Sequence, residues 1–312
     1  MSETPSLRRA LREATDVLAA AGVPSPAVDA ELLAAFALGR ESGHAVSRGE
    51  VQAAAVLGTE APAGLADLVA ARARRVPVQH LTGIAPFRGL ELVVGPGVFI
   101  PRPETEQVAQ MAIDEARAVM AGRGGALVVD LCTGSGAIAL AVAHEVDGAT
   151  VHAVELDAEA YGWAARNVAT LARRVALLRA DARTALRSLD GLVDVVVSNP
   201  PYVPPGAVPV DPEVAEHDPA VALYGLGPDG LEVPRGIIAA AARLLRPGGL
   251  LVMEHAEVQA AAAQAAVRRT GAFEQIGTRE DLAGRPRMVV ARRAPVVADP
   301  PSTQSDVEHS RS

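Results

Sequence analysis

Residues 128–143 read VVDLCTGSGAIALAVA: an apolar run, a short turn with two glycines, and a second apolar run. The first run predicts a buried β-strand, and the residues after the turn predict a helix. Gly134 and Gly136 lack a side chain, so the backbone of the turn can approach a ligand closely. The helix that follows presents its free amides at the same place. Since open α/β sheets bind ligands at the carboxyl ends of their strands, this stretch predicts a nucleotide-type ligand here.

The sequence around this stretch repeats the same alternation. Residues 108–292 alternate β-rich runs with helical ones such as 158–172 and 257–270, which indicates an α/β fold with a doubly wound, Rossmann-like sheet. Strands are predicted at ALVVDL (126–131), TVHAVEL (150–156), VALLRA (175–180), VDVVVSN (193–199), LLVMEH (250–255) and RMVVAR (287–292).

The rest of the chain divides into three further segments. Residues 1–76 predict a small all-helical bundle, with a helix start at Ser25-Pro26 and helix ends at Gly22 and Gly39. Residues 77–107 mix Gly, Pro, aromatic and β-branched residues, which predicts a hairpin and linker ahead of the sheet domain at 108–293. The Pro- and Ser-rich tail at 294–312 predicts disorder.

Composition argues against several classes of protein. The 312 residues are 49% hydrophobic, but charge or glycine interrupts each apolar stretch before the roughly 18 residues that a membrane span needs. The N-terminus lacks a secretory apolar core, and the single cysteine, Cys132, can form no internal disulfide, so we expect a cytoplasmic protein. The net charge of -8 counts against direct binding of nucleic acid. The seven histidines show no metal-ligand spacing, and no metal is expected.

Three acidic residues follow successive predicted strands. Asp130 ends the first strand, and Glu155 ends the second, where it can take both hydroxyls of a ribose. Asp181 follows the third strand, where an adenine amino group would need an acceptor. Gly134 to Ala139 also fits the dinucleotide pattern G-x-G-x-x-A with Glu155 as its ribose acid, so the glycines alone leave a nicotinamide dehydrogenase open.

The motif Ser198-Asn199-Pro200-Pro201-Tyr202 follows the apolar run at 193–197, at the same predicted sheet edge. Two consecutive prolines fix the backbone and remove two amide donors, which leaves carbonyl acceptors. The Asn199 oxygen and the Pro200 carbonyl can therefore accept both hydrogens of one NH2 group, and Tyr202 can lie against its plane. Such a clamp recognises an amide or an exocyclic amine and has no obvious use in hydride transfer.

The clamp suits methyl transfer to nitrogen. An amide nitrogen is a poor nucleophile because its lone pair is delocalised into the carbonyl group. An enzyme must hold this nitrogen in line with the sulfonium methyl of S-adenosylmethionine and withdraw positive charge as it develops. Acceptors directed at the NH2 group do both, and such positioning can supply several kcal/mol of the barrier.

These motifs together resemble the bacterial release factor glutamine methyltransferases, the HemK/PrmC family of class I S-adenosylmethionine-dependent enzymes. The Asn-Pro-Pro-Tyr motif alone is shared with DNA and RNA adenine methyltransferases, whereas its occurrence with Ile100-Pro101-Arg102-Pro103-Glu104-Thr105-Glu106 is more specific. The resemblance covers residues from about 72 to 292 and, more loosely, the helical N-terminus. It includes RRVPVQHLTG (74–83), FIPRPETE (99–106), DLCTGSGAIAL (130–140), AVELD (153–157), SNPPY (198–202), EHDPAVALYGLGPDGL (216–231) and RPGGLLVMEH (246–255).

The resemblance implies N5-methylation of the glutamine in the Gly-Gly-Gln motif of class 1 peptide chain release factors. It implies that Asn199, Pro200, Pro201 and Tyr202 hold the glutamine, with Asn199, Pro200 and Tyr202 as catalytic residues. The helical residues 1–76 are expected to bind the substrate protein. The residues expected at the cofactor are Phe99, Asp130, Cys132, Thr133, Gly134, Ser135, Gly136, Glu155, Asp181, Ala182 and Asn199.

Two positions depart from the family pattern, and the loop before the sheet allows two interpretations. Cys132 stands where many members have glycine, and we interpret it as a small packing residue under the turn. Ala182 stands where some relatives have an aromatic that covers the adenine, so another group must supply that wall. Phe99 either shields the sulfonium through a cation–π contact or belongs to the linker core. Arg102 and Glu104 can pair with each other and shape the loop.

Two other methyl acceptors remain open. Glutamine methylation of a ribosomal protein would use the same clamp, but we expect that family to lack the Arg-Pro-Glu-Thr-Glu motif. Adenine-N6 methylation would need base flipping and a basic surface or a recognition domain. The acidic composition provides neither.

Overall fold

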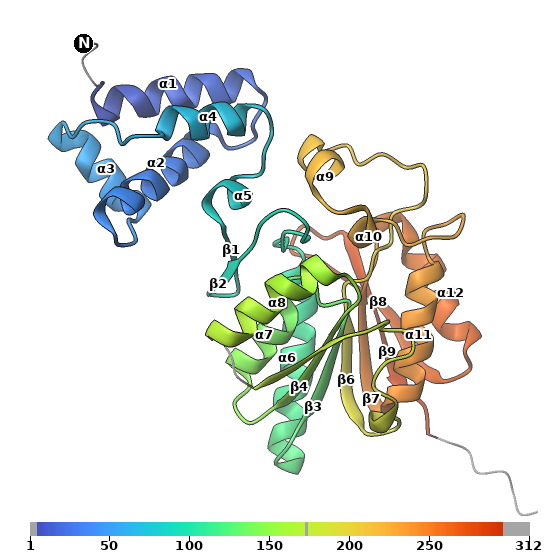
Figure 1. Cartoon of the computed structure of the whole chain (residues 1–312). Coiled ribbons are helices and arrows are strands. Elements are labelled where there is room, and N and C mark those ends of the chain that lie inside the picture. Colours follow the sequence, from blue (N-terminus) through green and yellow to red (C-terminus); the bar gives the residue numbers. More distant parts are fainter. Residues whose placement is uncertain (1–4, 172–173, 296–312) are drawn as a thin grey trace, which may run out of the picture.

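The computed structural model describes residues 5–171 and 174–295. Within these ranges a group of helices, a short hairpin and a seven-stranded sheet follow one another along the chain (Figure 1). The predicted disorder of the tail falls, from residue 296 onward, outside the described residues. Among the helices of the described part, none is long and apolar enough to cross a membrane.

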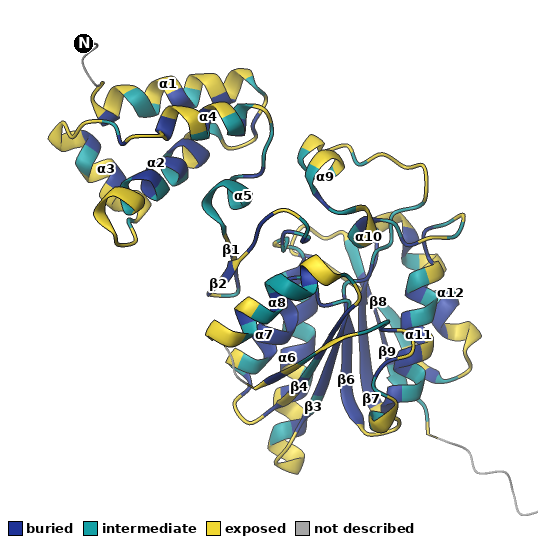
Figure 2. Cartoon of the chain, viewed as in Figure 1, coloured by how far each residue is buried: buried dark blue, intermediate teal, exposed yellow. Residues whose placement is uncertain are grey.

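The N-terminal helices enclose an apolar core of their own. Leu18, Leu33 and Val51 are completely buried in it, and the buried faces of these helices lie toward one another in Figure 2. The helices are α1 (Leu7–Ala20), α2 (Pro26–Ser42), α3 (Arg48–Leu57) and α4 (Leu65–Ala73).

Glycines follow the first three of these helices, but one predicted helix end is wrong. Gly22, with a φ of 71°, follows α1 as predicted, and α2 starts at Pro26 as predicted. The predicted end at Gly39 is wrong, because α2 continues until Gly43, whose φ of 75° is left-handed. Gly39 permits a close approach of the chain instead. A Cβ atom there would lie 3.0 Å from the carbonyl oxygen of His44.

A short connection leads from the helices to the sheet. It contains α5 (Val78–Thr82), which the sequence did not predict, and the predicted hairpin, formed by β1 (Ile84–Phe87) and β2 (Leu90–Val93). Arg88 and Gly89 both have positive φ angles, of 47° and 75°, which suits a two-residue hairpin turn.

Asn167 of α8 (Ala158–Leu171) joins this hairpin to the glycine turn. The side chain is completely buried, and its Oδ1 accepts a hydrogen bond from Val93 N at 2.8 Å. Its Nδ2 donates to the carbonyl oxygens of Val93 and Ser135, each at 3.0 Å. One amide thus satisfies backbone groups of both segments, so the hairpin supports the turn.

The large sheet has the order β5-β4-β3-β6-β7-β9-β8. Its first five strands are parallel; β9 then pairs with β7, and β8 with β9, each in antiparallel orientation. After β3 the chain forms β4 and β5 on one side of that strand, and it then returns to form β6 on the other side. The carboxyl ends of β3 and β6 therefore flank a topological switch point, which is where open α/β sheets usually bind ligands. The strands are β3 (Leu127–Leu131), β4 (Thr150–Glu155), β5 (Val175–Arg179), β6 (Val193–Ser198), β7 (Leu245–Glu254), β8 (Phe273–Glu280) and β9 (Pro286–Arg293).

Helices cover both faces of the sheet, as the doubly wound prediction requires (Figure 1). Alternate residues of β3 enter different cores. Val128 packs with α6 (Thr105–Arg123) and α7 (Ala137–Glu145), whereas Val129 packs with α11 (Glu232–Leu244) and α12 (Ala260–Arg269). Two 3-10 turns, η1 (Arg187–Leu189) and η2 (Glu257–Gln259), complete these elements, and η2 forms the start of the helix predicted at 257–270.

Two short helices between β6 and α11 escaped prediction, as did β8. The helices α9 (Pro212–His217) and α10 (Ala220–Leu223) lie over the carboxyl edge of the sheet in Figure 1. Strand β8 reads FEQIGTRE and lies at the sheet edge with mostly half-buried or exposed side chains, so it lacks a continuous apolar run.

The triple contact of Asn167 predicts a measurable loss of stability. We expect Asn167→Ala to lower the free energy of unfolding by about 2 to 3 kcal/mol, because it leaves buried backbone groups without partners. Urea denaturation would measure the change. Thr170→Ala, which removes an exposed hydroxyl from the same helix, should cost less than about 0.5 kcal/mol. Equal losses in the two variants would contradict the role of Asn167.

Candidate active site

A cavity of about 680 Å³ lies at the carboxyl edge of the sheet. It brings together most of the predicted site residues, which come from the segment before α6 and from the ends of four parallel strands. Asp130, Gly136 and Pro200 do not line it. The predicted residues that do are Phe99, Cys132, Thr133, Gly134, Ser135, Glu155, Asp181, Ala182, Asn199, Pro201 and Tyr202.

The turn after β3 follows a backbone path that favours glycine. Cys132, Gly134 and Gly136 have φ angles of 62°, 58° and 88°. Glycine adopts this left-handed region without strain, whereas an L-residue such as Cys132 pays about 1 to 2 kcal/mol. The Cys132 side chain packs beside the second sheet core while the residue also borders the cavity, and burial raises the pKa of its thiol. This agrees with its interpretation as a packing residue.

Asp130 lies behind the turn. Its Oδ2 accepts hydrogen bonds from Thr133 Oγ1 at 2.6 Å and from Ala139 N at 3.1 Å, so it joins the strand end to the first turn of α7. Its Oδ1 has no hydrogen-bond partner among the described residues. Burial raises the pKa of this carboxyl to about 7. Asp130 therefore shapes the cofactor loop from below and does not face the cavity.

Glu155 both borders the cavity and supports the turn. Its Oε2 accepts a hydrogen bond from Gly134 N at 2.8 Å, and its Oε1 accepts from the amides of Leu156 and Asp157 at 2.8 and 2.9 Å. Burial raises its pKa, although the three amides act in the opposite direction. A carboxylate has about four acceptor positions, and the three amides occupy all but one of them, so Glu155 can still accept from one ribose hydroxyl.

The predicted adenine end of the site is shaped by an ion pair. Asp181 accepts hydrogen bonds from the backbone amide and the guanidinium of Arg183, and the guanidinium contact lowers the pKa of Asp181. Arg183 packs against Gly236, where a Cβ atom would lie 2.6 Å from its Cδ. Arg183 and Leu156 also line the cavity beside Ala182. Both side chains are larger than that of Ala182 and border the cavity at the place where the sequence requires another group.

The Asn199 side chain is oriented for accepting a hydrogen bond from a ligand. Its Nδ2 donates to Thr105 Oγ1 at 3.2 Å. Because the carboxamide is planar, Oδ1 then lies on the opposite branch from Thr105 and is left as the acceptor. Asn199, Pro201 and Tyr202 line the cavity, and Pro200 is buried. The part of the clamp that the structure brings to the cavity is thus the asparagine, the second proline and the tyrosine.

Two residues behind the clamp were missed at the sequence level. Thr105 Oγ1 donates to Glu254 Oε2 at 2.8 Å, and the Tyr202 hydroxyl donates to Glu254 Oε1 at 3.3 Å. Thr105 and Glu254 are both buried. Each lies inside a stretch that the family resemblance includes, at 99–106 and 246–255, and those stretches were the available signal.

The loop before α6 lies at the mouth of the cavity. Phe99 borders it, and one face of its ring carries the guanidinium of Arg102 at 5.2 Å. The proposed Arg102–Glu104 pair is wrong: Arg102 Nη2 pairs with Asp218 at 2.6 Å, and Glu104 lies 3.7 Å from Arg285. Asp218 follows α9, so this ion pair holds the α9 segment to the loop.

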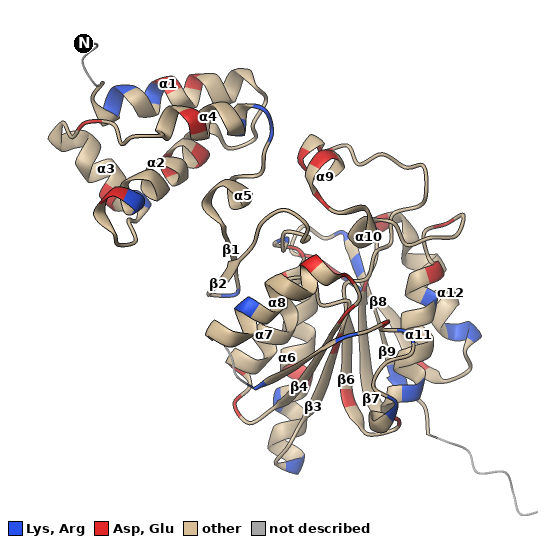
Figure 3. Cartoon of the chain, viewed as in Figure 1, with Lys and Arg blue, Asp and Glu red and all other residues tan. Residues whose placement is uncertain are grey.

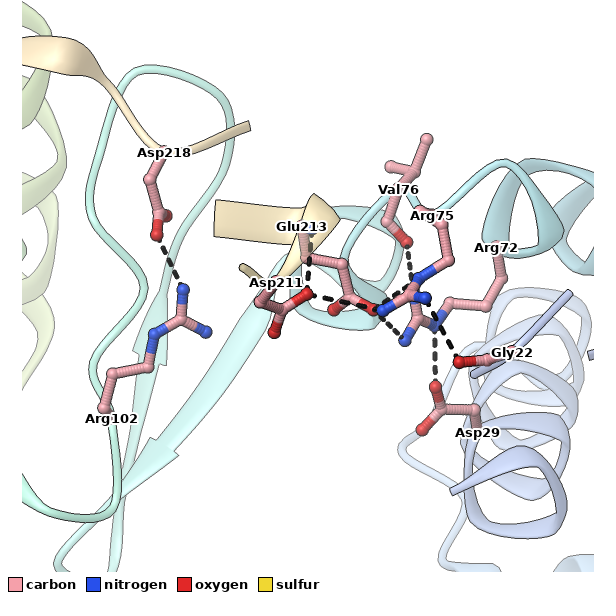
Figure 4. Close-up of polar contacts among 9 residues, drawn as sticks. All are labelled: Gly22, Asp29, Arg72, Arg75, Val76, Arg102, Asp211, Glu213 and Asp218. Atoms are coloured by element: carbon pink, nitrogen blue, oxygen red, sulfur yellow. Dashed lines mark hydrogen bonds and ion pairs between the residues drawn. The ribbon is translucent and has the colours of Figure 1, made fainter. Parts of the chain in front are cut away.

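A second set of ion pairs joins α9 to the N-terminal helices (Figure 4). Arg72 of α4 contacts Asp29 of α2 at 2.6 Å and Glu213 of α9 at 2.7 Å, and only 3% of its side chain is exposed. Arg75 lies 2.9 Å from the same Glu213. Figure 3 shows the acidic α9 near the basic residues after α4. The helical part is therefore attached at the rim of the cavity, since Val214 of α9 lines it.

The cavity suits S-adenosylmethionine. A Cβ atom at Gly134 would meet no atom of the described residues within 4 Å, so the space above this glycine is open. At Gly136 it would lie 3.1 Å from Leu140 Cδ1, so that glycine serves packing within the protein. The Glu155 carboxylate, which can accept from a ribose hydroxyl, lies beside this open turn. The volume of the cavity is typical of small-molecule ligand sites. The described residues contain no group of three or more His, Cys, Asp or Glu that could hold a metal ion.

The glycine turn at 132–136 and the acceptor clamp at 199–202 both border one cavity, which lies at the switch point of a doubly wound sheet. A cofactor site for a nucleoside beside acceptors for an NH2 group defines an S-adenosylmethionine-dependent methyltransferase that acts on nitrogen. Residues 9–83 match the PrmC N-terminal domain, and residues 102–216 match the methyltransferase small domain.

Full-length relatives identify the family. The chain is 49% identical over 287 residues to the release factor glutamine methyltransferase of Mycolicibacterium smegmatis, which covers 92% of this chain and 98% of the relative. The chain belongs to the release factor glutamine methyltransferase family. It is also 40% identical over 278 residues to the 4-amino-L-phenylalanine/4-methylamino-L-phenylalanine methyltransferase of Streptomyces pristinaespiralis, covering 88% of this chain and 91% of that one.

A solved structure supports the fold. The catalytic domain of hMettl16, in complex with MAT2A 3'UTR hairpin 6, matches 75% of this chain and 84% of its own with a TM-score of 0.50 and 18% identity.

The two glycines of the turn can be separated by experiment. We expect Gly134→Ala to fill open ligand space and to weaken binding of S-adenosylmethionine at least about tenfold in calorimetry, with a moderate loss of stability from the left-handed φ. We expect Gly136→Ala to lower stability more, because its Cβ also meets Leu140. If Gly134→Ala binds the cofactor normally, the turn does not contact it.

Proposed function

We propose that this chain transfers a methyl group from S-adenosylmethionine to the side-chain amide nitrogen of the glutamine in the Gly-Gly-Gln motif of class 1 peptide chain release factors. The product is N5-methylglutamine, and the reaction takes place in the cytoplasm on a protein substrate, without direct binding of nucleic acid or membrane. The relatives named for this activity support the proposal, and the other open acceptors, a ribosomal glutamine and an adenine, lack such support.

One observation carries the proposal: the Asn199 carboxamide has its nitrogen bound to Thr105 and its oxygen free for a ligand. An oxygen in this position accepts an N–H and repels a carbonyl or carboxylate oxygen. The clamp therefore selects NH2 groups, and glutamine presents one on a side chain long enough to enter a cavity.

The chain's own residues would act by holding and polarising the amide. S-adenosylmethionine, when bound by the turn and Glu155, supplies a methyl group on a positively charged sulfur. Asn199 Oδ1 accepts one N–H of the glutamine, and this hydrogen bond strengthens as the nitrogen becomes positive. The Tyr202 ring, which lines the cavity, gives the amide plane a surface, and burial of its hydroxyl raises the pKa of that group, which stays protonated. No base has to remove a proton before transfer: the nitrogen becomes positive as it takes the methyl group from the sulfur, and the neutral N-methyl amide then forms by release of one N–H proton to water.

The N-terminal helices support a role in holding the release factor. They carry no chemical motif, yet Arg72 and Arg75 attach them to Glu213 at the cavity rim. A protein substrate whose loop enters the cavity must pass this rim. We infer that the helical residues 1–76 contact the body of the release factor while its loop is in the cavity.

Mass spectrometry tests the main proposal. Incubation of the enzyme with S-adenosylmethionine and a class 1 release factor should add one methyl group to the Gly-Gly-Gln peptide. A release factor with glutamate in place of that glutamine presents no NH2 group and should remain unmodified. Asn199→Ala should lower kcat on the order of 10²-fold while cofactor affinity changes little.

The similarity to an amino-phenylalanine methyltransferase supplies a sharp alternative outcome. Free 4-amino-L-phenylalanine offers an exocyclic NH2 group without a protein around it, so it should be methylated poorly or not at all. Efficient turnover of this amino acid, with an unmodified release factor, would contradict the proposal and point to a small-molecule substrate.

The proposed role of the helical part predicts different effects on the KM for the release factor and on the Kd for S-adenosylmethionine. Glu213→Gln keeps the shape but weakens the ion pairs with Arg72 and Arg75, so we expect a severalfold higher KM for the release factor and an unchanged Kd for S-adenosylmethionine. Glu13→Gln, which alters the exposed pair with Arg9 on α1, is the matched control and should change neither. An increase in both constants for Glu213→Gln would mean that the helices only support the fold.

A further inference from the structure

Four side chains from three separate parts of the chain converge behind the clamp. Thr105 begins α6, Glu254 ends β7, and Asn199 and Tyr202 follow β6. The hydrogen bonds run from Asn199 Nδ2 to Thr105 Oγ1 and from Thr105 Oγ1 to Glu254 Oε2, and the Tyr202 hydroxyl reaches the other oxygen of the same carboxyl. This network is not required by sheet packing, because its members lie beyond the ends of the strands or at their last residue.

The network fixes hydrogen-bond direction because its donors are few. A threonine hydroxyl has one proton, and an ionised carboxylate can only accept. When the Thr105 hydroxyl donates its proton to Glu254, its oxygen can only accept a hydrogen bond from Asn199. Asn199 must therefore donate with its side-chain N–H. The carboxamide oxygen of Asn199 is then forced to the other side, where a substrate N–H needs it.

We propose that Glu254 is a positioning residue of the methyl transfer: through the Thr105 hydroxyl its carboxylate holds the Asn199 amide with the oxygen toward the substrate, and it anchors the Tyr202 hydroxyl at the same time. The inference rests on the proposed function, because the orientation matters only for a substrate with an NH2 group. It also gives a purpose to the Pro-Glu-Thr-Glu and Met-Glu-His stretches that accompany the clamp in this sequence.

The charge of Glu254 is the variable that controls this direction. A protonated Glu254 can donate a hydrogen bond to the Thr105 oxygen. The Thr105 hydroxyl can then donate to the Asn199 oxygen, so the Asn199 carboxamide can flip and exchange the positions of its oxygen and nitrogen. Burial raises the pKa of Glu254 to about 7, while Arg287 of β9 opposes the shift and Glu104 adds to it. The neighbouring His255 is itself buried, with its pKa lowered. The positioning function is therefore present above about pH 7 and lost as the pH falls below it.

Two variants of Thr105 test the pathway through the hydroxyl. Thr105→Val keeps the shape and removes the relay, so kcat for the release factor should fall about tenfold or more, whereas Thr105→Ser keeps the hydroxyl and should stay within about twofold of the wild type. Calorimetry should give the same Kd for S-adenosylmethionine in all three proteins. Equal kcat values for Thr105→Val and Thr105→Ser would overturn the proposal.

The pH profile tests the charge. At saturating cofactor and substrate, kcat of the wild type should rise with pH to a plateau above about pH 7. Glu254→Gln should lose this acidic limb and remain at least about tenfold below the plateau, because a neutral amide does not force the Thr105 proton in one direction. Asp194→Asn, a buried carboxylate variant at the opposite end of β6 with partners Arg123 and Leu127, should keep the limb. An acidic limb that persists in Glu254→Gln, or a wild-type profile without one, would overturn the proposal.

A readout independent of activity separates this inference from the proposed function. The side-chain amide signal of Asn199 in ¹⁵N NMR, assigned by its disappearance in Asn199→Ala, should move with a midpoint near pH 7 in the wild type and not in Glu254→Gln. If the release factor is never methylated but this titration is found, the proposed function fails and the positioning network stands. If the release factor is methylated but the Asn199 signal does not change with pH and is the same in Glu254→Gln, the positioning role of Glu254 is wrong and the proposed function stands.

Discussion

The carboxylate of Asp130 is the contact on which the cofactor side depends. It accepts from Thr133 and from the first turn of α7, and so it determines how the chain leaves β3 and enters the helix. That path requires left-handed residues at 132, 134 and 136 and brings the Gly134 amide to Glu155. Asn167 then connects the same turn to the hairpin. The cavity wall is thus held in place by polar contacts that reach behind it to Asp130 and Asn167.

Concentrating buried carboxyls at one sheet edge has an energetic consequence. Asp130 and Glu254 have folded-state pKa values of about 7, well above the values near 4 of an unfolded chain. Because the folded pKa values are raised, these groups stabilise the protein fully below about pH 4, and that contribution is lost as the pH rises through 7. The site therefore keeps charges that folding alone would remove, which is expected where positioning of a reacting group has been favoured over stability.

The sequence predicts those features that depend on local pattern. Uninterrupted apolar runs mark β3, β6, β7 and β9, and the glycine turn has a recognisable spacing. The helices α9 and α10 were missed because they are short, and the α9 segment is held by a tertiary contact, Arg102–Asp218. Strand β8 was missed because most of its side chains are half-buried or exposed. The roles of Thr105 and Glu254 could not be read from the sequence, because the residues lie 149 positions apart and only the folded sheet brings them together.

The ion pairs through Arg72 also bear on how a substrate is recognised. A guanidinium that is almost fully buried and bonded on both sides resists separation, because opening either contact strands a charge, at about 3 to 5 kcal/mol. The helical part and the cavity rim therefore keep a constant spacing. This fixed spacing sets the distance between the surface on which a substrate protein would rest and the site of methyl transfer. A protein that rests against the helices reaches Asn199 only if its glutamine projects from its surface by the matching distance, so selectivity among glutamines can arise from reach as much as from local sequence.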